Sequence, residues 1–397
     1  MSSDSTSTSS DTERSLLEAW SSEQAVDHHC HPLFPWPRAV AARQLRAVFT
    51  EAVDPEILDE HVPALAAYRD AIRRLAHELE CEPTEEAVLE ARGKADPAAY
   101  VNRLLQRSGT GMLLLDSGYT SGAPFSLEEH SRAIPLPQRE VVRLETLAER
   151  FIAAAASPAD WLAAVRSGLR EAVRGGVVGV KTIAAYRAGL TLRPVDAGDL
   201  DAAFGELQQR ARSGGSLRIS GEPLIYSLLT EGAEECAQLG VPLQVHSGFG
   251  DNDEDLAKSS PLGLRPLLVD SRYQGLKLVF LHCYPFHREA AYLCAVYRDV
   301  YMDLSLGIPL AALDGKRAMR ETLGLCPWTK VLYASDASRL PEIYFVAAAV
   351  HREALAGAFG EFVERGILSH DDAVAAGVQV LSSNARRVYN LGAGRVG

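Results

Sequence analysis

From about residue 110 onward, short apolar runs alternate with longer segments of helical period. In the helical segments, for example Pro158–Arg174 and Pro223–Leu239, apolar side chains recur every three or four positions. With a first strand near Val26 the apolar runs number eight, the others being Gly111–Leu115, Val141–Leu144, Val177–Val180, Leu243–Val245, Leu276–Leu281, Val300–Leu304 and Lys330–Tyr333. Strands alternating with helices predict a parallel sheet with right-handed crossovers. Eight strands predict an α/β fold, a closed (β/α)8 barrel of the TIM type, whereas six or seven would fit an open doubly wound sheet equally well.

A block of helical period, Val40–Gln106, separates the first two predicted strands. Ala, Leu, Glu and Arg dominate it, and Asp54-Pro55, Glu82-Pro83 and Asp96-Pro97 mark helix starts, because proline is tolerated in the first helical turn. The block is too long for one crossover helix. We therefore expect a helical insertion after strand one that covers the pocket as a lid or contributes to a homodimer contact.

The sequence predicts a single domain with a short tail at each end. Residues 1–13 are mostly Ser, Thr and Asp, which predicts a disordered tail without the basic and apolar regions of a secretory signal. A short helix is expected to end near Trp20. Residues 14–391 are expected to form a single barrel domain, and residues 392–397 a C-terminal tail.

The net charge and the cysteines indicate what the protein binds and in which compartment it works. Forty Lys and Arg residues against 52 Asp and Glu residues give a net charge of −12, which argues against binding to nucleic acid or to anionic membranes. No run approaches the ~18 apolar residues that span a bilayer. Six cysteines without a CxxC pair predict reduced thiols and a cytoplasmic protein. We therefore expect a small-molecule substrate.

Polar residues recur where the predicted strands end. They are His29 and His31, Asp116, Lys181, His246, His282 and Asp336. Alone, each histidine would more often be a satisfied core residue, and Asp336 would cap the helix that begins near Pro341. In a barrel, however, the carboxyl ends of all strands face one pocket. Imidazoles and a carboxylate together suit a divalent metal, with Zn²⁺ as the first expectation and Mn²⁺ as the alternative.

Five short sequence motifs resemble those of a known family. They are Asp27-His28-His29-Cys30-His31, Lys181-Thr182-Ile183-Ala184-Ala185-Tyr186-Arg187, His246-Ser247-Gly248-Phe249-Gly250-Asp251, Leu281-His282-Cys283-Tyr284-Pro285-Phe286 and Ala334-Ser335-Asp336-Ala337. In these strings the chain resembles the amidohydrolase superfamily, in its family 2 branch, and most closely the FluG and nodulin-like amidohydrolases. Some relatives carry a fused glutamine synthetase domain; we expect none after Leu391, so the resemblance implies the stand-alone form.

The resemblance implies a ligand set. His29, His31, His246 and Asp336 would bind the metal, and His282 would be a ligand to a second ion or a group that polarises the substrate. Lys181 matches the lysine that is carboxylated and bridges two metals in binuclear members. The alternative for Lys181 is an ion pair with Asp116 or Glu145, and one or two ions remain open.

The expected reaction is hydrolysis of a C–N amide bond by a metal-activated water, with Asp336 as the proton carrier and His282 beside the carbonyl. Substrate contacts are expected from residues just past strand ends, namely Tyr119, Tyr186, Arg187, Tyr284 and Arg288. Arginine would receive a substrate carboxylate. Family association adds a γ-glutamyl amide as the substrate type. The alternatives are a non-oxidative decarboxylase of the same superfamily and a catalytically silent binding protein.

Overall fold

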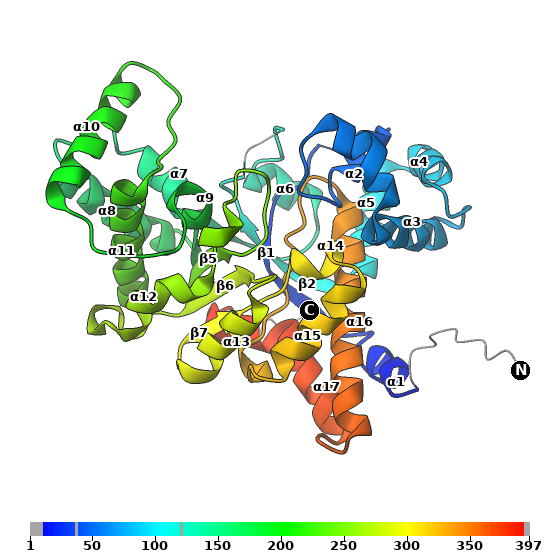
Figure 1. Ribbon diagram of the computed structural model, residues 1–397. Helices are drawn as coiled ribbons and strands as arrows, with labels where there is room; N and C mark the ends of the chain where they lie inside the picture. The colour runs from blue at the N-terminus through cyan, green and yellow to red at the C-terminus, as the bar shows by residue number, and fades with distance from the viewer. Residues whose placement is uncertain (1–10, 36–38, 120–121, 393–397) are drawn as a thin grey trace, which may run out of the picture.

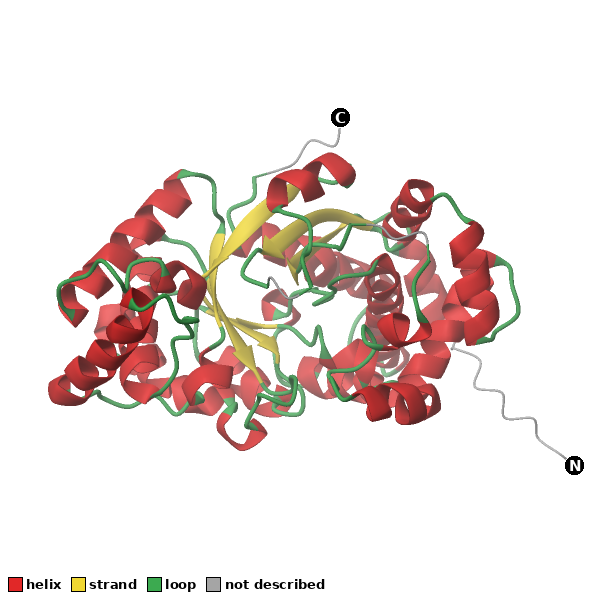
Figure 2. Ribbon diagram, turned by 90° about the horizontal axis from the view of Figure 1, so that it is seen from above, coloured by secondary structure: helices red, strands yellow, loops and turns green. Residues whose placement is uncertain are grey.

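The computed structural model describes residues 11–35, 39–119 and 122–392. Within these residues the chain forms an α/β fold around one curled parallel sheet, with seven strands paired in sequence order. The strands are β1 (Ala25–Cys30), β2 (Thr110–Asp116), β3 (Gln138–Arg143), β4 (Gly179–Thr182), β5 (Leu243–Ser247), β6 (Leu278–His282) and β7 (Val300–Met302). Figure 2 shows the curl of the sheet and the helices that pack around it.

Helices connect successive strands and surround the sheet (Figure 1). Between β2 and β7 they are α6 (Leu127–Ala133), α7 (Leu144–Glu149), α8 (Pro158–Arg174), α9 (Ala184–Ala188), α10 (Ala197–Arg212), α11 (Glu222–Leu239), α12 (Arg265–Val269) and α13 (His287–Val296), with short helices η3 (Leu256–Lys258), η4 (Pro261–Leu264) and η5 (Ser271–Tyr273). After β7 come α14 (Gly307–Leu310), α15 (Leu313–Leu323), η6 (Trp328–Lys330), α16 (Pro341–Glu364), α17 (His370–Val378), η7 (Gln379–Ser383) and α18 (Asn384–Val388).

Helix α8 shows why such a segment forms. Ser157 caps its N-terminus by accepting a hydrogen bond from the backbone N–H of Asp160, and Pro158 occupies the first turn without losing a bond. Trp161, Val165 and Leu169 recur on one face and are fully buried. The sequence pattern therefore predicts both this helix and the face that it buries.

The seven apolar runs from Val26 to Val300 each coincide with or overlap a strand, as predicted, but Lys330–Tyr333 does not. There the structure has a single parallel bridge from Val331 to Met302 of β7. On the other side, the backbone N–H of His28 donates to the carbonyl of Tyr333. The segment thus lies between the two outer strands β7 and β1 without a regular ladder, and next to it the side chain of Asp27 receives the backbone N–H and hydroxyl of Ser335.

The block between β1 and β2 is helical, as predicted. It contains α2 (Ala42–Arg46), η1 (Ile57–His61), η2 (Val62–Ala64), α3 (Ala66–Leu79), α4 (Glu85–Lys94) and α5 (Pro97–Arg107). Pro97 begins α5 as expected, whereas α4 starts at Glu85 because Thr84, not Glu82, provides the cap. The block has its own apolar cluster, in which Tyr68, Leu75 and Val101 pack with Tyr344 of α16.

The predicted N-terminal tail is too long. Helix α1 (Asp11–Ala19) already includes Asp11–Glu13, because Leu16 and Trp20 are fully buried and anchor the helix against the C-terminal part of the chain. Residues 1–10 of the predicted tail and residues 393–397 of the C-terminal tail lie outside the described residues. Among the described helices, none has the length and apolar character to cross a membrane.

Candidate metal centre

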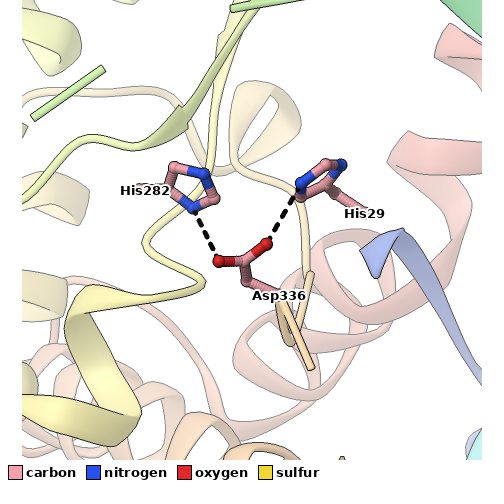
Figure 3. Close-up of side chains that lie close together, drawn as sticks. All are labelled: His29, His282 and Asp336. Carbon is pink, nitrogen blue, oxygen red and sulfur yellow. Dashed lines mark ion pairs between the residues drawn. The ribbon is translucent and has the colours of Figure 1, made fainter. Parts of the chain in front are cut away.

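The candidate site lies where the carboxyl ends of β1 and β6 meet the loop that contains Asp336. Oδ1 of Asp336 lies 3.1 Å from Nε2 of His29 and 3.3 Å from Nε2 of His31. Oδ2 of Asp336 lies 3.8 Å from Nδ1 of His282, and Figure 3 shows the carboxylate between His29 and His282. Two groups in the described residues have ligand atoms within 4.8 Å of one another: His29, His282 and Asp336, and also His29, His31 and Asp116.

Two of these residues, His282 and Asp336, have a strained backbone conformation. His282 has a φ of 67° and Asp336 a φ of 52°, in the left-handed region that few side chains adopt. The backbone N–H of His282 donates to Oδ1 of Asp303, and that of Asp336 donates to the carbonyl of His29. Such strain costs about 1–3 kcal/mol for each residue and is concentrated at functional sites.

Hydrogen bonds behind the cluster determine which imidazole nitrogens carry the protons. Nδ1 of His29 lies 2.9 Å from Oε1 of Gln244, and Nδ1 of His31 lies 3.2 Å from the backbone carbonyl of Asp116. Both partners are acceptors, so both Nδ1 atoms donate and both Nε2 atoms keep a lone pair. Two lone pairs and a carboxylate oxygen therefore converge with no proton between them, which is a donor set that fits a cation.

Burial keeps the imidazoles of His29 and His282 neutral, as metal ligands must be. Burial, together with the nearby Lys181 ammonium, lowers the pKa of His29 to about 3, and burial lowers that of His282 to about 4. Burial alone would raise the pKa of Asp336, but His282, His29 and His31 outweigh it and hold the pKa well below its usual range. At neutral pH, Asp336 is therefore ionised beside the neutral imidazoles of His29 and His282.

Lys181 is buried at the end of β4, with Nζ 3.3 Å from Nε2 of His29. Burial lowers the pKa of this lysine to about 8. Neither of the carboxylates considered from the sequence is its partner. Asp116 pairs with Arg143 at 2.5 Å, and Glu145 accepts hydrogen bonds from the hydroxyl of Thr182 and the backbone of Ile183.

His246 lies beside the cluster without contacting Asp336 directly. Its ring packs on those of His282 and Tyr186, with centroids 4.5 and 4.4 Å apart. Nε2 of His246 is buried and lies 3.9 Å from Oε2 of Glu254, whose side chain is 2% exposed. Sequence reasoning missed Glu254, because it belongs to the polar run Asp251–Asp255, which is typical of a surface loop.

A pocket of about 250 Å³ opens over the cluster. Its wall includes Arg187, whose Nε and Nη1 are buried and have no hydrogen-bond partner among the described residues. Glu51 and neighbouring residues of the β1–β2 block form another part of the wall. Burial, with Asp336 and Asp251 nearby, raises the pKa of Glu51 to about 8. The pocket thus offers unpaired guanidinium donors within a largely acidic protein.

The predicted substrate contacts separate into two groups. Tyr119, Tyr186 and Arg187 line the pocket. Tyr284 and Arg288 do not, which corrects the expectation for these two residues. The hydroxyl of Tyr284 donates to Asp314, and Arg288 pairs with Glu321 on the outside of the molecule. The chain turns outward into α13 immediately after β6, so proximity to a strand end in sequence does not bring them to the pocket.

Two sequence comparisons relate the chain to known proteins. Residues 141–391 match a family model described as Amidohydrolase. The protein fluG of Emericella nidulans is 28% identical over 401 residues, covering 92% of this chain and 45% of that protein. The chain thus spans less than half the length of this curated relative.

Two solved structures extend the comparison. A candidate metal-dependent hydrolase from Lactobacillus casei ATCC 334 has a TM-score of 0.84 and 31% identity, covering 95% of this chain and 97% of that one. Glucuronate isomerase from Caulobacter crescentus has a TM-score of 0.67 at 15% identity, covering 100% and 98%, and this likeness concerns the fold alone. Since the family model matches well over half of its residues, the chain belongs to the amidohydrolase family.

Proposed function

We propose that the protein is a metal-dependent hydrolase that cleaves the C–N amide bond of a small substrate bearing a carboxylate. One observation carries the proposal: the unprotonated Nε2 atoms of His29 and His31 lie 3.1 and 3.3 Å from the same oxygen of Asp336. Family membership supports the same reading. As a finer point of the fold, we propose that the segment around Val331 takes the eighth strand position of a (β/α)8 barrel with the β1–β2 block as its insertion.

The proposed metal-linked residues are His29, His31, His246, His282, Asp336 and Lys181. A divalent ion, Zn²⁺ or alternatively Mn²⁺, would supply Lewis acidity and lower the pKa of a water from about 15.7 to about 7. Lys181 is included because Nζ lies 3.3 Å from His29 and neither Asp116 nor Glu145 pairs with it. Its pKa of about 8 leaves part of the amine uncharged at neutral pH, as carboxylation of a lysine requires.

Asp336 is the proposed proton carrier. Its carboxylate is ionised and lies at the floor of the pocket, so it takes the proton of the attacking water and passes it to the leaving nitrogen. His282 is assigned to the ligands, not to polarising the carbonyl. Its Nδ1 donates to Ser305, which leaves a lone pair on Nε2 and no second N–H to offer a carbonyl oxygen.

Substrate selection is assigned to Arg187. Its Nε and Nη1 are buried and have no hydrogen-bond partner among the described residues, so the guanidinium can receive a substrate carboxylate, and Tyr119 and Tyr186 line the same pocket. The family association drawn from the sequence makes γ-glutamyl amides the first substrates to examine, because glutamate carries a carboxylate of the required kind.

The test is product analysis with the zinc- or manganese-loaded protein. The substrates are γ-glutamyl amides, N-acyl amino acids, carboxamides without a carboxylate, and aromatic carboxylic acids. The proposal expects amine release from the amides that carry a carboxylate and little from those that lack one. Release of CO₂ from the acids, without amine from any amide, would replace the hydrolase with a decarboxylase.

A further inference from the structure

A buried chain of polar contacts runs behind the candidate metal centre and joins His29 to His282. Its five members come from β1, β5, the segment after β7 and the C-terminal segment, and each is at most 2% exposed. We call them the Asp303 network; they are Gln244, Tyr389, His28, Asp303 and Ser305. The inference drawn from them rests on the proposed function, since it concerns residues that would hold the metal.

The first arm starts at His29. Nδ1 of His29 donates to Oε1 of Gln244 at 2.9 Å, and Nε2 of Gln244 donates to the hydroxyl of Tyr389 at 2.8 Å. The same amide nitrogen donates to the carbonyl of His28, which fixes the orientation of the amide. The hydroxyl of Tyr389, having accepted from Gln244, has its own proton for Nδ1 of His28 at 3.0 Å.

The arm ends on Asp303. Since Nδ1 of His28 accepts, Nε2 of His28 carries the proton, and it lies 2.9 Å from Oδ2 of Asp303. The two atoms are in contact at this distance, but the contact does not meet hydrogen-bond geometry. It is therefore the weakest link of the network.

The second arm starts at His282. Nδ1 of His282 lies 2.8 Å from the hydroxyl of Ser305, and that hydroxyl donates to Oδ1 of Asp303 at 2.7 Å. The hydroxyl proton is thus committed, and Ser305 accepts from His282. Oδ1 of Asp303 also receives the backbone N–H of His282 at 2.7 Å. Apart from the second N–H of Gln244, which donates to the carbonyl of His28, the donors in both arms are therefore ordered toward one carboxylate.

We propose that the Asp303 network is a positioning device that holds His29 and His282 as one unit, with the proton of each imidazole on Nδ1 and the lone pair on Nε2. Metal-binding histidines generally donate their second nitrogen to such partners, and losing the partner typically weakens metal binding 10–100-fold. Here each ligand has its own acceptor, Gln244 for His29 and Ser305 for His282, and the two arms meet at the carboxylate of Asp303. Tyr389 is far in sequence from the metal-binding histidines, yet through its contact with Gln244 it contributes to the affinity for the metal.

The test measures metal affinity by competition with a chelating dye, using Zn²⁺ and Co²⁺ on the full chain. Tyr389→Phe and Ser305→Ala are each expected to weaken binding about tenfold, and Ser305→Thr to restore it because the hydroxyl returns. The double variant is expected to lose less than the product of the two single losses, because the arms share Asp303. Tyr226→Phe is the matched control, since Tyr226 is a buried tyrosine outside the network.

A second readout needs no metal. In the apo protein, ¹⁵N spectra of the imidazoles should place the protons of His29 and His282 on Nδ1, and Gln244→Leu should change this for His29. If affinity and proton position are unchanged in the variants while only the melting temperature falls, the network is merely structural and the proposal is overturned. If the wild type binds no metal but the spectra behave as stated, the proposed function fails and the positioning role survives.

Discussion

Asp336 is the residue that the proposed chemistry uses most directly. We predict that Asp336→Asn lowers turnover about 100-fold or more, since a positioned general base contributes about 10²–10⁴-fold. Asparagine is the appropriate replacement because it tolerates the left-handed backbone at this position, where φ is 52°. Steady-state kinetics would measure the effect, with Asp255→Asn as the control, since Asp255 is an exposed partner of Lys258. Full turnover in Asp336→Asn would remove Asp336 from the mechanism.

Arg187 gives a prediction about selectivity at the same scale. A charge-assisted hydrogen bond is worth about 1.5–3 kcal/mol, so Arg187→Ala should raise KM by about 10–100-fold for substrates with a carboxylate. Amides without a carboxylate should be unaffected. Arg288→Ala is the matched control, because that arginine lies outside the pocket and pairs with Glu321. An equal loss for both substrate types would mean that Arg187 supports the pocket without reading the substrate.

Among the elements, α16 ties the β1–β2 block to the rest of the protein. Glu342 in its first turn is fully buried and accepts hydrogen bonds from Arg92 of α4 and Tyr100 of α5. Removing one partner of a buried pair typically costs about 3–5 kcal/mol. We predict a loss of that size in the free energy of unfolding of Glu342→Ala, measured with urea. Glu90→Gln, which breaks an exposed pair with Lys94, should leave unfolding unchanged. A loss below 1 kcal/mol in Glu342→Ala would contradict the account.

Helix α16 also carries His351, which is buried against Tyr333. Burial lowers the pKa of His351 from 6.5 to about 4. As pH falls, the imidazole is therefore protonated in the unfolded chain before it is protonated in the folded protein. Its contribution to the free energy of unfolding is fully present above pH 6.5 and is lost as the pH falls toward 4.

His351→Asn removes the titration but keeps a donor for the carbonyl of Ala347. The stability advantage of wild type over His351→Asn should shrink by about 3 kcal/mol between pH 6.5 and pH 4, measured by denaturant unfolding of the apo protein. A difference that stays constant across this range would show that His351 does not titrate in the folded state as described.

At the scale of the whole molecule, the sequence predicts most of the framework. Alternating apolar runs and helical segments locate seven strands, because buried parallel strands and amphipathic helices have distinct periods. The same reasoning fails around Val331. There the apolar run resembles a strand, but it forms a single bridge, from Val331 to Met302, and the backbone N–H of Ser335 bonds to the side chain of Asp27. A side-chain acceptor of this kind has no signature in hydrophobic period.

The candidate site is predictable only in part. His29, His282 and Asp336 could be found because strand ends converge in a parallel fold. Gln244 and Tyr389 could not, since a glutamine in a strand and a tyrosine in a helical segment acquire a role only through their partners in space. Arg288 was assigned wrongly because sequence position near a strand end does not fix the direction in which the following helix leaves.

The most direct test of the central claim is elemental analysis of the protein purified without chelators, beside the double variant His29→Ala/His31→Ala. The account predicts at least one equivalent of divalent metal in the wild type and its loss in the variant, because both Nε2 lone pairs at Asp336 are then removed. Near two equivalents would support a binuclear centre that includes Lys181, and near one would support a mononuclear centre. Absence of metal from the wild type, even after incubation with zinc or manganese, would contradict the proposed hydrolase.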